Sequence, residues 1–224
     1  TTASVGTAVQ ECSQILLKKL FELTKFDGIK FEDVGVENGR FVGKFKHLSF
    51  VDILKSNNLE NLSETHTTNP NYGERGKYST ASHGAQFVEV KVDEELGIVK
   101  VTRVVELTAA GKIINPKGAK SQEIGGVVWG IGMALHEETN IDHRYGRIMN
   151  PDLGSYYVPT NADILDVQTG FVEEVDTIVN PLGVKGLGEL GMVGIPAAIA
   201  NAIYHATGKR MRDLPITVDK LLAS

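Results

Sequence analysis

Hydrophobic and polar positions along this chain repeat with two different periods, and each period predicts a different element. Between residues 7 and 25, apolar side chains recur every three or four positions, which is the spacing of one face of an α-helix. We therefore predict an amphipathic helix over 7–25, capped by Ser4 or Thr7. A second, short helix is predicted to begin at Ser49, because Asp52 follows it with the spacing of a capping box.

The middle of the chain has the two-residue period of strands. Apolar and polar residues alternate almost strictly over 85–92, a polar turn follows, and 98–105 is a second run rich in β-branched residues. Together these runs predict a β-hairpin. A further strand is predicted within 166–179.

Two helices are predicted in the second half of the chain. One covers 121–138 despite four glycines, each of which costs a helix up to about 1 kcal/mol. We expect such a helix to be stable only if another element packs closely against it. The second helix covers 194–207, with Pro196 in its first turn and Gly208 at its end.

A polar stretch at 57–78 separates two parts of the chain. It contains the turn-forming run from Asn69 to Gly73, and we interpret it as a long loop. The sequence therefore predicts two α+β subdomains, an incomplete one at 1–80 and a second at 81–224. The predicted fold class is α+β, with mixed β-sheets covered by helices on one face.

Composition is that of an ordinary globular protein and narrows the possible functions. The 224 residues are 42% hydrophobic and 23% charged, and the net charge of −5 disfavours a nucleic acid or an anionic membrane as partner. No apolar run reaches the roughly 18 residues that cross a bilayer. The single cysteine, Cys12, excludes an intrachain disulfide, a cysteine zinc site and an iron–sulfur cluster held by this chain alone.

The segment 183–191 is the most informative for chemistry. Four glycines surround one carboxylate, Glu189, shortly before the predicted helix 194–207. Glycines allow a close backbone approach, and such a loop suits a bound anion or a buried cofactor. By spacing alone, a surface loop with a solvated glutamate is the commoner explanation. A nucleotide-phosphate site is disfavoured because the loop lacks a terminal Lys-Ser/Thr.

Two further segments could contact a ligand. Gln122 would lie near a helix N-terminus with its amide available, although helix capping and tight packing explain the segment as well. The run from Thr1 to Ser4 enters the first helix, whose N-terminus attracts phosphate, but ordinary N-capping explains that pattern equally. The six histidines lack zinc-hydrolase spacing, and no Gly-x-Ser-x-Gly nucleophile elbow is present.

Together and in this order, these segments resemble the C-terminal portion of the molybdopterin-binding (large) subunit of the xanthine dehydrogenase/aldehyde oxidoreductase family. The likeness covers nearly the whole chain and is weakest over 27–80. The matching segments are Thr1-Thr2-Ala3-Ser4, Ile113-Ile114-Asn115-Pro116, Gln122 with Gly125-Gly126, Tyr157-Val158-Pro159, Lys185-Gly186-Leu187-Gly188-Glu189 and Asp213-Leu214-Pro215-Ile216-Thr217. The ending most resembles bacterial aldehyde oxidoreductases with several subunits.

The resemblance implies a role for each matching residue. Glu189 would be the general base beside molybdenum, in a dry pocket. The backbone of Ala3 would approach the metal, which would receive no side-chain ligand from this chain. For Gly186 and Gly188 the role is inferred from their lack of a side chain and not from the resemblance: they would let the loop reach the metal without a clash. The residues predicted to bind the cofactor are Thr1, Ala3, Ser4, Gln122, Gly186 and Gly188.

The implied activity is that of a molybdenum hydroxylase, which oxidises aldehydes or N-heterocycles with water as the oxygen source. Its cofactor would be molybdenum–molybdopterin, in either the mononucleotide or the cytosine dinucleotide form, and likeness to the bacterial enzymes favours the cytosine form. Iron–sulfur clusters and FAD would lie only on partner domains or subunits. The N-terminal remainder of the molybdenum subunit would complete the metal site.

The resemblance places the assembled enzyme in a bacterial cytoplasm or periplasm. Taken alone, the chain is expected to be an inactive excised or split piece. A non-catalytic scaffold or assembly domain with the same fold is the alternative, and the presence of Glu189 and Gln122 argues against it.

Overall fold

The computed structural model describes residues 2–24, 28–43, 47–68 and 76–223, which divide into two compact units. Unit 1 comprises Thr1–Gly76 with Asn180–Leu182, and unit 2 comprises Lys77–Val179 with Gly183–Ser224. The domain boundary at residue 80 stays a prediction, because a compact unit need not be a domain that folds alone.

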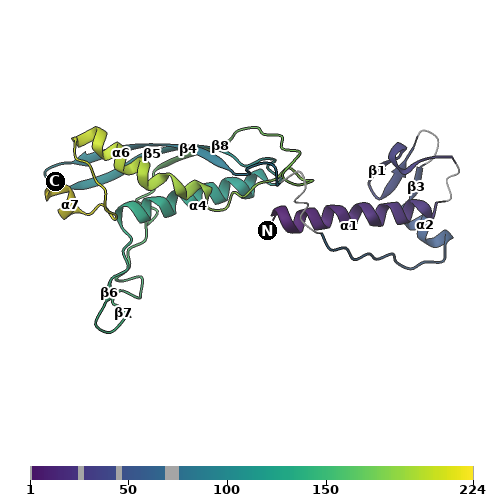
Figure 1. Cartoon of the computed structure of the whole chain (residues 1–224), viewed down its shortest axis with the longest axis horizontal. Helices are drawn as coiled ribbons and strands as arrows, with labels where there is room; N and C mark the ends of the chain where they lie inside the picture. The colour runs from purple at the N-terminus through teal and green to yellow at the C-terminus, as the bar shows by residue number, and fades with distance from the viewer. Residues whose placement is uncertain (1, 25–27, 44–46, 69–75, 224) are drawn as a thin grey trace. The chain divides into compact units, whose positions relative to one another are not determined.

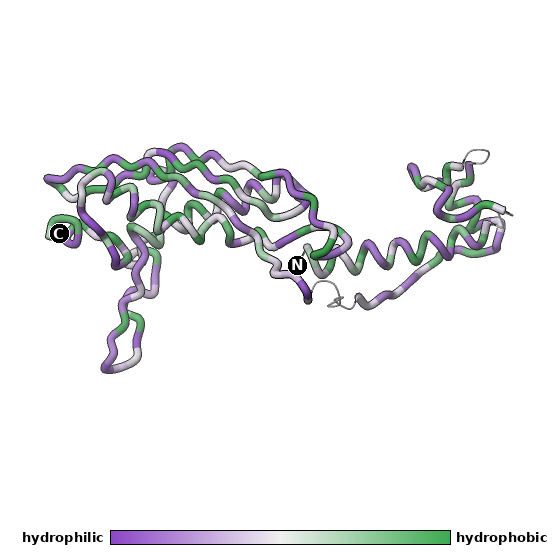
Figure 2. The backbone as a smooth tube through the Cα atoms, turned by 45° about the horizontal axis from the view of Figure 1, so that its top comes forward, coloured by the Kyte–Doolittle hydropathy of each residue, from purple (hydrophilic) through white to green (hydrophobic). Residues whose placement is uncertain are grey.

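Unit 1 packs a long helix against a small antiparallel sheet. Its elements are α1 (Thr2–Glu22), η1 (Phe31–Asp33), β1 (Gly35–Glu37), β2 (Arg40–Val42), β3 (His47–Ser49) and α2 (Phe50–Ser56). Phe41 of β2 is fully buried with Leu20 and Ile53, and the Phe21 ring meets it edge-on with the ring centroids 5.6 Å apart. Figure 2 shows hydrophobic and hydrophilic residues alternating along α1, as the amphipathic pattern predicts.

The predicted start of α1 is wrong, whereas that of α2 is confirmed. Helix α1 begins at Thr2 rather than at residue 7, because no proline interrupts the first turn and a single glycine is tolerated there. Thr7 therefore lies inside the helix, where its hydroxyl donates to the Ala3 carbonyl at 2.6 Å. Ser49 caps α2 by accepting a hydrogen bond from the Asp52 amide.

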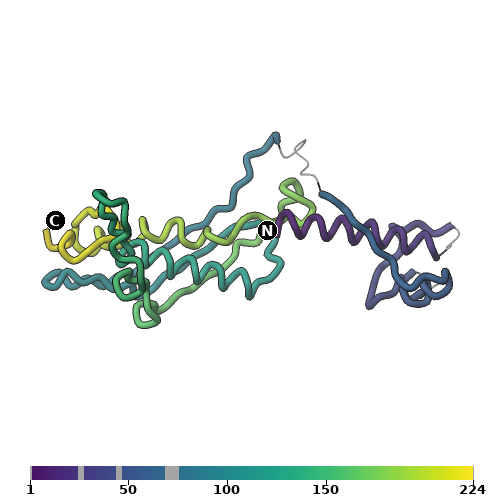
Figure 3. Tube along the Cα trace, turned by 90° about the horizontal axis from the view of Figure 1, so that it is seen from below, coloured from purple at the N-terminus to yellow at the C-terminus, as the bar shows by residue number. Residues whose placement is uncertain are grey.

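Unit 2 is built on a mixed three-stranded sheet. Its elements are β4 (His83–Asp93), β5 (Ile98–Ala109), α4 (Pro116–Leu135), β6 (Ile141–Asp142), β7 (Arg147–Ile148), β8 (Asp166–Phe171), α5 (Leu190–Val193), α6 (Ile195–Thr207) and α7 (Val218–Ala223). Strand β5 pairs antiparallel with β4 and parallel with β8, so the predicted hairpin and the α+β class with a mixed sheet are confirmed. Helices α4 and α6 lie side by side along the sheet (Figures 1 and 3).

The core of unit 2 lies between this sheet and the two long helices. Val104 of β5, Val127 of α4 and Ile199 of α6 are completely buried there. Alternate side chains of the sheet point to the opposite face, where Phe87 and Leu107 are exposed. Helices thus cover one face of the sheet, as the sequence predicts.

Helix α4 begins and ends earlier than predicted. Asn115 caps it by accepting from the Gly118 amide at 3.0 Å, and Pro116 fits the first turn, where no backbone N–H partner is needed. The helix ends at Leu135 rather than at residue 138. Gln122 therefore lies two turns inside the helix and not near its N-terminus.

Other predicted boundaries also change. Within 166–179 only β8 is a strand, and the chain after Phe171 is irregular. The polar stretch contains no helix or strand over its described part, 57–68 and 76–78, while the run from Asn69 to Gly73 lies outside the described residues. Helix α6, with Pro196 in its first turn and Gly208 at its end in the left-handed conformation, is confirmed.

Three elements of unit 2 were not predicted: α5, α7 and the hairpin of β6 and β7, which projects from the sheet and helices of this unit (Figure 1). In the part of the chain that the structure describes, no helix is both long and apolar enough to cross a membrane.

The glycines of α4 allow other elements to approach its backbone closely. A Cβ built on Gly126 would lie 2.9 Å from the amide nitrogen of Met192 in α5, and one on Gly130 would lie 2.6 Å from Cβ of Ile195 in α6. Both distances are too short for real atoms. The close packing predicted for this helix is thus confirmed at these two positions. Gly125, in contrast, has no atom within 4 Å of such a Cβ.

We predict that Gly126→Ala destabilises the protein by about 1–3 kcal/mol, because the new methyl group would overlap backbone atoms of α5. A backbone cannot move aside by a change of rotamer as a flexible side chain can. The matched control Gly125→Ala should be neutral or stabilising by up to about 1 kcal/mol, since the methyl group enters open space and alanine favours a helix. Denaturant unfolding of both variants measures the difference. Equal stability changes in the two variants would contradict this packing.

Candidate functional site

The glycine-rich loop of unit 2 starts from a stem that is paired to the end of β5. Val184 forms an isolated antiparallel bridge with Gly111. The Lys112 amide donates to the Gly183 carbonyl at 2.7 Å, and the Lys185 amide donates to the Ala110 carbonyl at 3.0 Å. Gly111 and Gly183 both have positive φ angles, and a Cβ on Gly183 would lie 2.7 Å from a backbone oxygen. The start of the loop is therefore fixed by backbone hydrogen bonds.

The Lys185 side chain ties this stem to the segment after β8. It is nearly buried and forms ion pairs with Glu174 and with Asp176, the latter at 3.2 Å. The second oxygen of Glu174 accepts a hydrogen bond from the Gly111 amide at 2.8 Å. One lysine and one glutamate thereby link three segments of the chain.

These contacts shift the pKa values of the three groups in the directions expected of ion pairs. The Lys185 ammonium lowers the pKa of Glu174, helped by the Gly111 amide. Backbone amides of Val179 and Ile178 are the main cause of the lowered pKa of Asp176, with a smaller contribution from Lys185. The pKa of Lys185 is raised, chiefly by its hydrogen bond to Glu174. All three groups are therefore charged at neutral pH.

The tip of the loop is open and carries the predicted base. Ser82 donates a hydrogen bond to the Gly186 carbonyl, but no atom lies within 4 Å of a Cβ built on Gly186. Glu189 directly precedes α5 and is exposed to solvent, rather than lying in the dry pocket that the sequence comparison implies. The described residues around it do not exclude water from its carboxylate.

The structure brings Gln122 next to this tip. A Cβ on Gly188 would lie 3.7 Å from the side-chain oxygen of Gln122, which is itself exposed on α4. Gly125, one turn further along α4, is exposed as well and has open space above it. Unit 2 thus places the side-chain amide of Gln122 beside the turn that carries Glu189. Gly125 on α4 and Gly186 in the loop leave open space on the same two segments.

Beneath the turn lie two carboxyl groups that the sequence reading missed, Glu106 of β5 and Glu123 of α4. Both side chains are completely buried. Burial, a hydrogen bond with Glu106 and the charge of Glu106 raise the pKa of Glu123 to about 8. The alternation of β5 is the only sequence signal for Glu106, because Glu106 lies on the same face of the strand as the buried Val104. Glutamate is usually solvated, so this signal is weak.

The other predicted site residues belong to unit 1 or lie outside the described residues. Thr1 is among those not described. Ala3 and Ser4 are exposed in the first turn of α1, as part of the helix and not of a segment leading into it. The metal contact assigned to the Ala3 backbone stays a prediction, and so do the cofactor contacts of Thr1 and Ser4.

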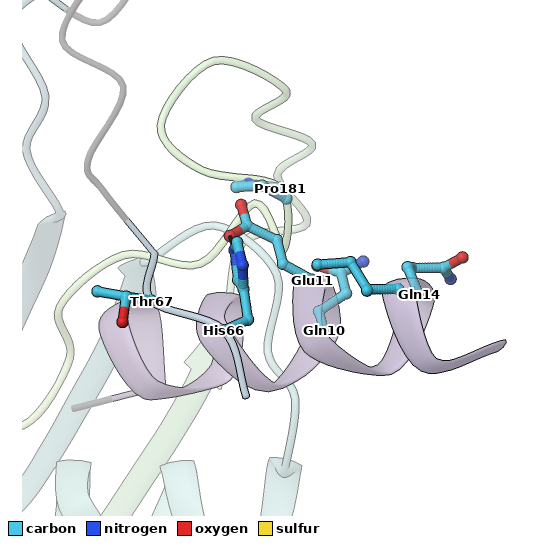
Figure 4. A pocket seen from close by; sticks show the side chains of 7 residues that line it. Gln10, Glu11, Gln14, His66, Thr67 and Pro181 are labelled. Carbon is cyan, nitrogen blue, oxygen red and sulfur yellow. Dashed lines mark hydrogen bonds and ion pairs between the residues drawn. The ribbon is translucent and has the colours of Figure 1, made fainter. Parts of the chain in front are cut away.

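Unit 1 also contains an open pocket of about 580 Å³ beside α1, which does not include the predicted site residues (Figure 4). His66 lies 3.0 Å from a Glu11 oxygen that also accepts a hydrogen bond from Thr68 at 2.6 Å. The hydroxyl of Thr68 and then His66 lower the pKa of Glu11. Among the described residues, no group of three or more His, Cys, Asp or Glu side chains could hold a metal ion.

Comparisons with known proteins agree on one family. A family model described as molybdopterin cofactor-binding domain matches residues 1–165. The chain is 48% identical over 146 residues to the aldehyde oxidoreductase molybdenum-binding subunit PaoC of Escherichia coli (strain K12), a match that covers 65% of this chain and 20% of that protein. It is 38% identical over 138 residues to the putative xanthine dehydrogenase molybdenum-binding subunit XdhA of the same organism, covering 62% of this chain and 18% of that protein. The chain thus spans about a fifth of the length of these relatives.

Solved structures support the fold over different extents of the chain. Quinoline 2-oxidoreductase from Pseudomonas putida 86 aligns with a TM-score of 0.80 at 21% identity, covering 100% of this chain and 30% of that one. The aldehyde oxidoreductase from Desulfovibrio desulfuricans aligns with a TM-score of 0.57 at 31% identity, covering 63% of this chain and 15% of that one.

We predict that Lys185→Met destabilises unit 2 by about 2 kcal/mol at pH 7, because two carboxylates lose their charged hydrogen-bond donor. The pKa values of Glu174 and Asp176 are lowered in the folded state, so their stabilisation is present above the ordinary carboxyl range and is lost as pH falls below it. The difference in the free energy of unfolding between variant and wild type should therefore become smaller below about pH 4. Urea unfolding at pH 7 and at pH 3.5 tests this, and a constant difference would refute the ion-pair explanation.

Proposed function

Since this chain belongs to the family of molybdopterin cofactor-binding domains in the molybdenum-binding subunits of aldehyde oxidoreductases and xanthine dehydrogenases, we propose that it supplies the catalytic base and part of the cofactor-binding surface of a molybdenum hydroxylase. The assembled enzyme would oxidise aldehydes or N-heterocycles with water as the oxygen source. Aldehydes are favoured because the relative with 48% identity is named an aldehyde oxidoreductase subunit.

One observation carries this proposal: Gln122 adjoins the turn that presents Glu189. The side-chain oxygen of Gln122 lies close to Gly188, and the glutamate follows immediately in the chain. Neither side chain is covered by the described residues. Gly186 and Gly125 leave space that a side chain would otherwise fill, and the fold gives no packing reason for a glycine at either position. The residues present therefore fit a large polar group held against this surface.

The molybdenum cofactor, when bound, supplies the two-electron oxidation of the substrate. Gln122 would donate a hydrogen bond to the pterin or accept one from it. The absence of a side chain on Gly188 would let the pterin come close to the loop. Glu189 would act as general base and take the proton of the hydroxyl that is transferred to the substrate carbon. The cofactor, the substrate and the remainder of the subunit would cover the exposed carboxylate and exclude water from it.

The remaining parts of the enzyme lie beyond this chain in our proposal. The chain spans about a fifth of its relatives' length, so the rest of a molybdenum subunit would complete the site. Iron–sulfur clusters and FAD would be carried by partner domains or subunits, and we favour the cytosine dinucleotide form of the cofactor. The alternative, a non-catalytic scaffold of the same fold, predicts no molybdenum and no pterin in the native assembly.

We predict that Glu189→Gln in the assembled enzyme lowers turnover by at least about 10²-fold, because glutamine keeps the shape but cannot accept the proton. Molybdenum and pterin content should stay at the wild-type level. Steady-state kinetics and metal analysis of the purified enzyme measure both quantities. As a control, Glu94→Gln replaces an exposed glutamate in the turn between β4 and β5 and should leave turnover unchanged. Near-normal turnover of the Glu189 variant would refute its assignment as the base.

A second prediction concerns Gln122. Gln122→Ala should weaken the affinity for the cofactor about fivefold and so lower the amount retained by the assembled enzyme, since one hydrogen bond of about 1 kcal/mol is lost. Ser121→Ala, which alters an exposed neighbour on the same helix, should not change occupancy. Pterin content after gel filtration provides the measurement, and equal occupancy in both variants would contradict a cofactor contact at Gln122.

A further inference from the structure

The buried carboxyl groups of Glu106 and Glu123, which we call the carboxyl pair, have an unusual environment. Neither side chain has any exposed surface. The Gln86 amide donates to one oxygen of Glu106 at 2.9 Å. The other oxygen of Glu106 and both oxygens of Glu123 are buried with no donor among the described residues. The carboxyl pair therefore has one donor for four acceptor oxygens.

Two buried negative charges without a cation would strongly destabilise the fold. A single proton relieves the conflict, because a protonated carboxyl group is itself a donor and can bond to the neighbouring carboxylate. That bond supplies the missing partner and removes one of the two charges. The arrangement of partners thus requires the carboxyl pair to hold one proton in the folded protein.

The carboxyl pair also forms the surface on which α5 rests. A Cβ on Gly191 would lie 3.0 Å from an oxygen of Glu123 and 3.2 Å from the unpaired oxygen of Glu106. At the other end of α5, Gly194 sits directly against the side-chain oxygen of Gln86, the same amide that donates to Glu106. Glu189 is two residues before Gly191, so the position of its turn depends on the carboxyl pair and Gln86, which lie beneath α5.

We propose that Glu106 and Glu123 are positioning residues, which share one proton and thereby hold α5 and the turn of Glu189 in place. This proposal rests on the proposed function, because the position of Glu189 affects turnover only if Glu189 is the general base. Loss of the shared proton at alkaline pH leaves two like charges under α5, and their repulsion displaces the turn.

Among the described residues, Glu106 is the charged group that acts on Glu123. Gln86 faces the carboxyl pair from β4, Thr169 of β8 stands opposite Glu106 in the strand register, and α5 presents glycine backbone. The pKa of Glu123, raised to about 8 by burial and by Glu106, sets the pH at which the proton leaves. The raised pKa means that stability declines as pH rises from the ordinary carboxyl range to about 8.

The test is Glu123→Gln, because glutamine imitates the protonated glutamate and donates to Glu106 at every pH. In the assembled enzyme, wild-type kcat/KM should fall about tenfold from pH 7 to pH 9, as a one-proton loss near pH 8 requires. The variant should match the wild type within about twofold at pH 7 and lose less than about twofold by pH 9. Glu94→Gln is the matched control and should follow the wild-type profile.

Two measurements on the 224-residue chain do not depend on the cofactor. The infrared carbonyl band of a protonated carboxyl group should be present at pH 7 in the wild type, titrate near pH 8, and be absent from Glu123→Gln. At pH 9, amide hydrogen exchange over 187–194 should be faster in the wild type than in the variant, both measured at the same pH.

The possible failures are distinguishable. Absence of the band at pH 7, or lower thermal stability of Glu123→Gln than of wild type at pH 7, would overturn the shared proton. Coincident pH profiles of wild type and variant would overturn the positioning role while leaving the proposed function intact. Near-normal turnover of Glu189→Gln would instead overturn the proposed function, and the infrared band would still report on the carboxyl pair.

Discussion

The close approach of α5 to α4 is the constraint on which the site of unit 2 depends. Only glycine at 126 and 191 lets the two backbones come together, because a Cβ at either position would overlap backbone atoms of the other element. This contact brings the end of the glycine-rich loop down onto α4 and over the buried carboxyl groups. Gln122 and the turn of Glu189, which are 67 positions apart in the sequence, become neighbours as a result.

The loop is fixed at both ends and open between them. Its stem is held by backbone pairing with 110–112 and by the ion pairs of Lys185, while its far end rests on Gly126 and on the carboxyl pair. Between these anchors, a Cβ built on Gly186 would have no atom within 4 Å, although the Gly186 carbonyl accepts a hydrogen bond from Ser82. A rigid support under a short exposed turn is the arrangement expected of a catalytic group, since positioning within a fraction of an ångström requires neighbours that cannot move.

Local patterns predicted the elements well where one physical rule dominated. The β4–β5 hairpin follows from strict alternation, and α6 follows from a proline and a glycine at fixed ends. The predicted start of α4 is wrong because Asn115 and Pro116, which precede the glycine-rich run, form the cap and the first turn of the helix. The close packing expected of this helix holds at Gly126 and Gly130.

The site was only partly predictable, because its assignments came from resemblance and its support came from tertiary contacts. No local rule indicates that Glu106 and Glu123 are buried together, since the same residue type usually marks a solvated surface. Nor does any local rule pair Lys185 with Glu174, which lies on a segment that leaves the sheet irregularly. Charge burial is a property of the assembled fold and is not visible to a pattern of hydrophobic and polar positions.

The exposed face of α4 bears on the interpretation of Glu189. Gln122, Gly125, Trp129 and Met133 recur with helical spacing, and all four are exposed, Trp129 to 47% and Met133 to 44%. An exposed mid-helix glycine lowers stability without serving any contact in the described residues, and two large apolar side chains beside it remain in water. Such a surface fits a chain that spans about a fifth of its relatives' length and belongs to a cofactor-binding family. In the proposed function, Glu189 would therefore acquire low-dielectric surroundings only when the cofactor and the rest of the subunit cover this face, and α5 with the carboxyl pair beneath it would hold its turn in position.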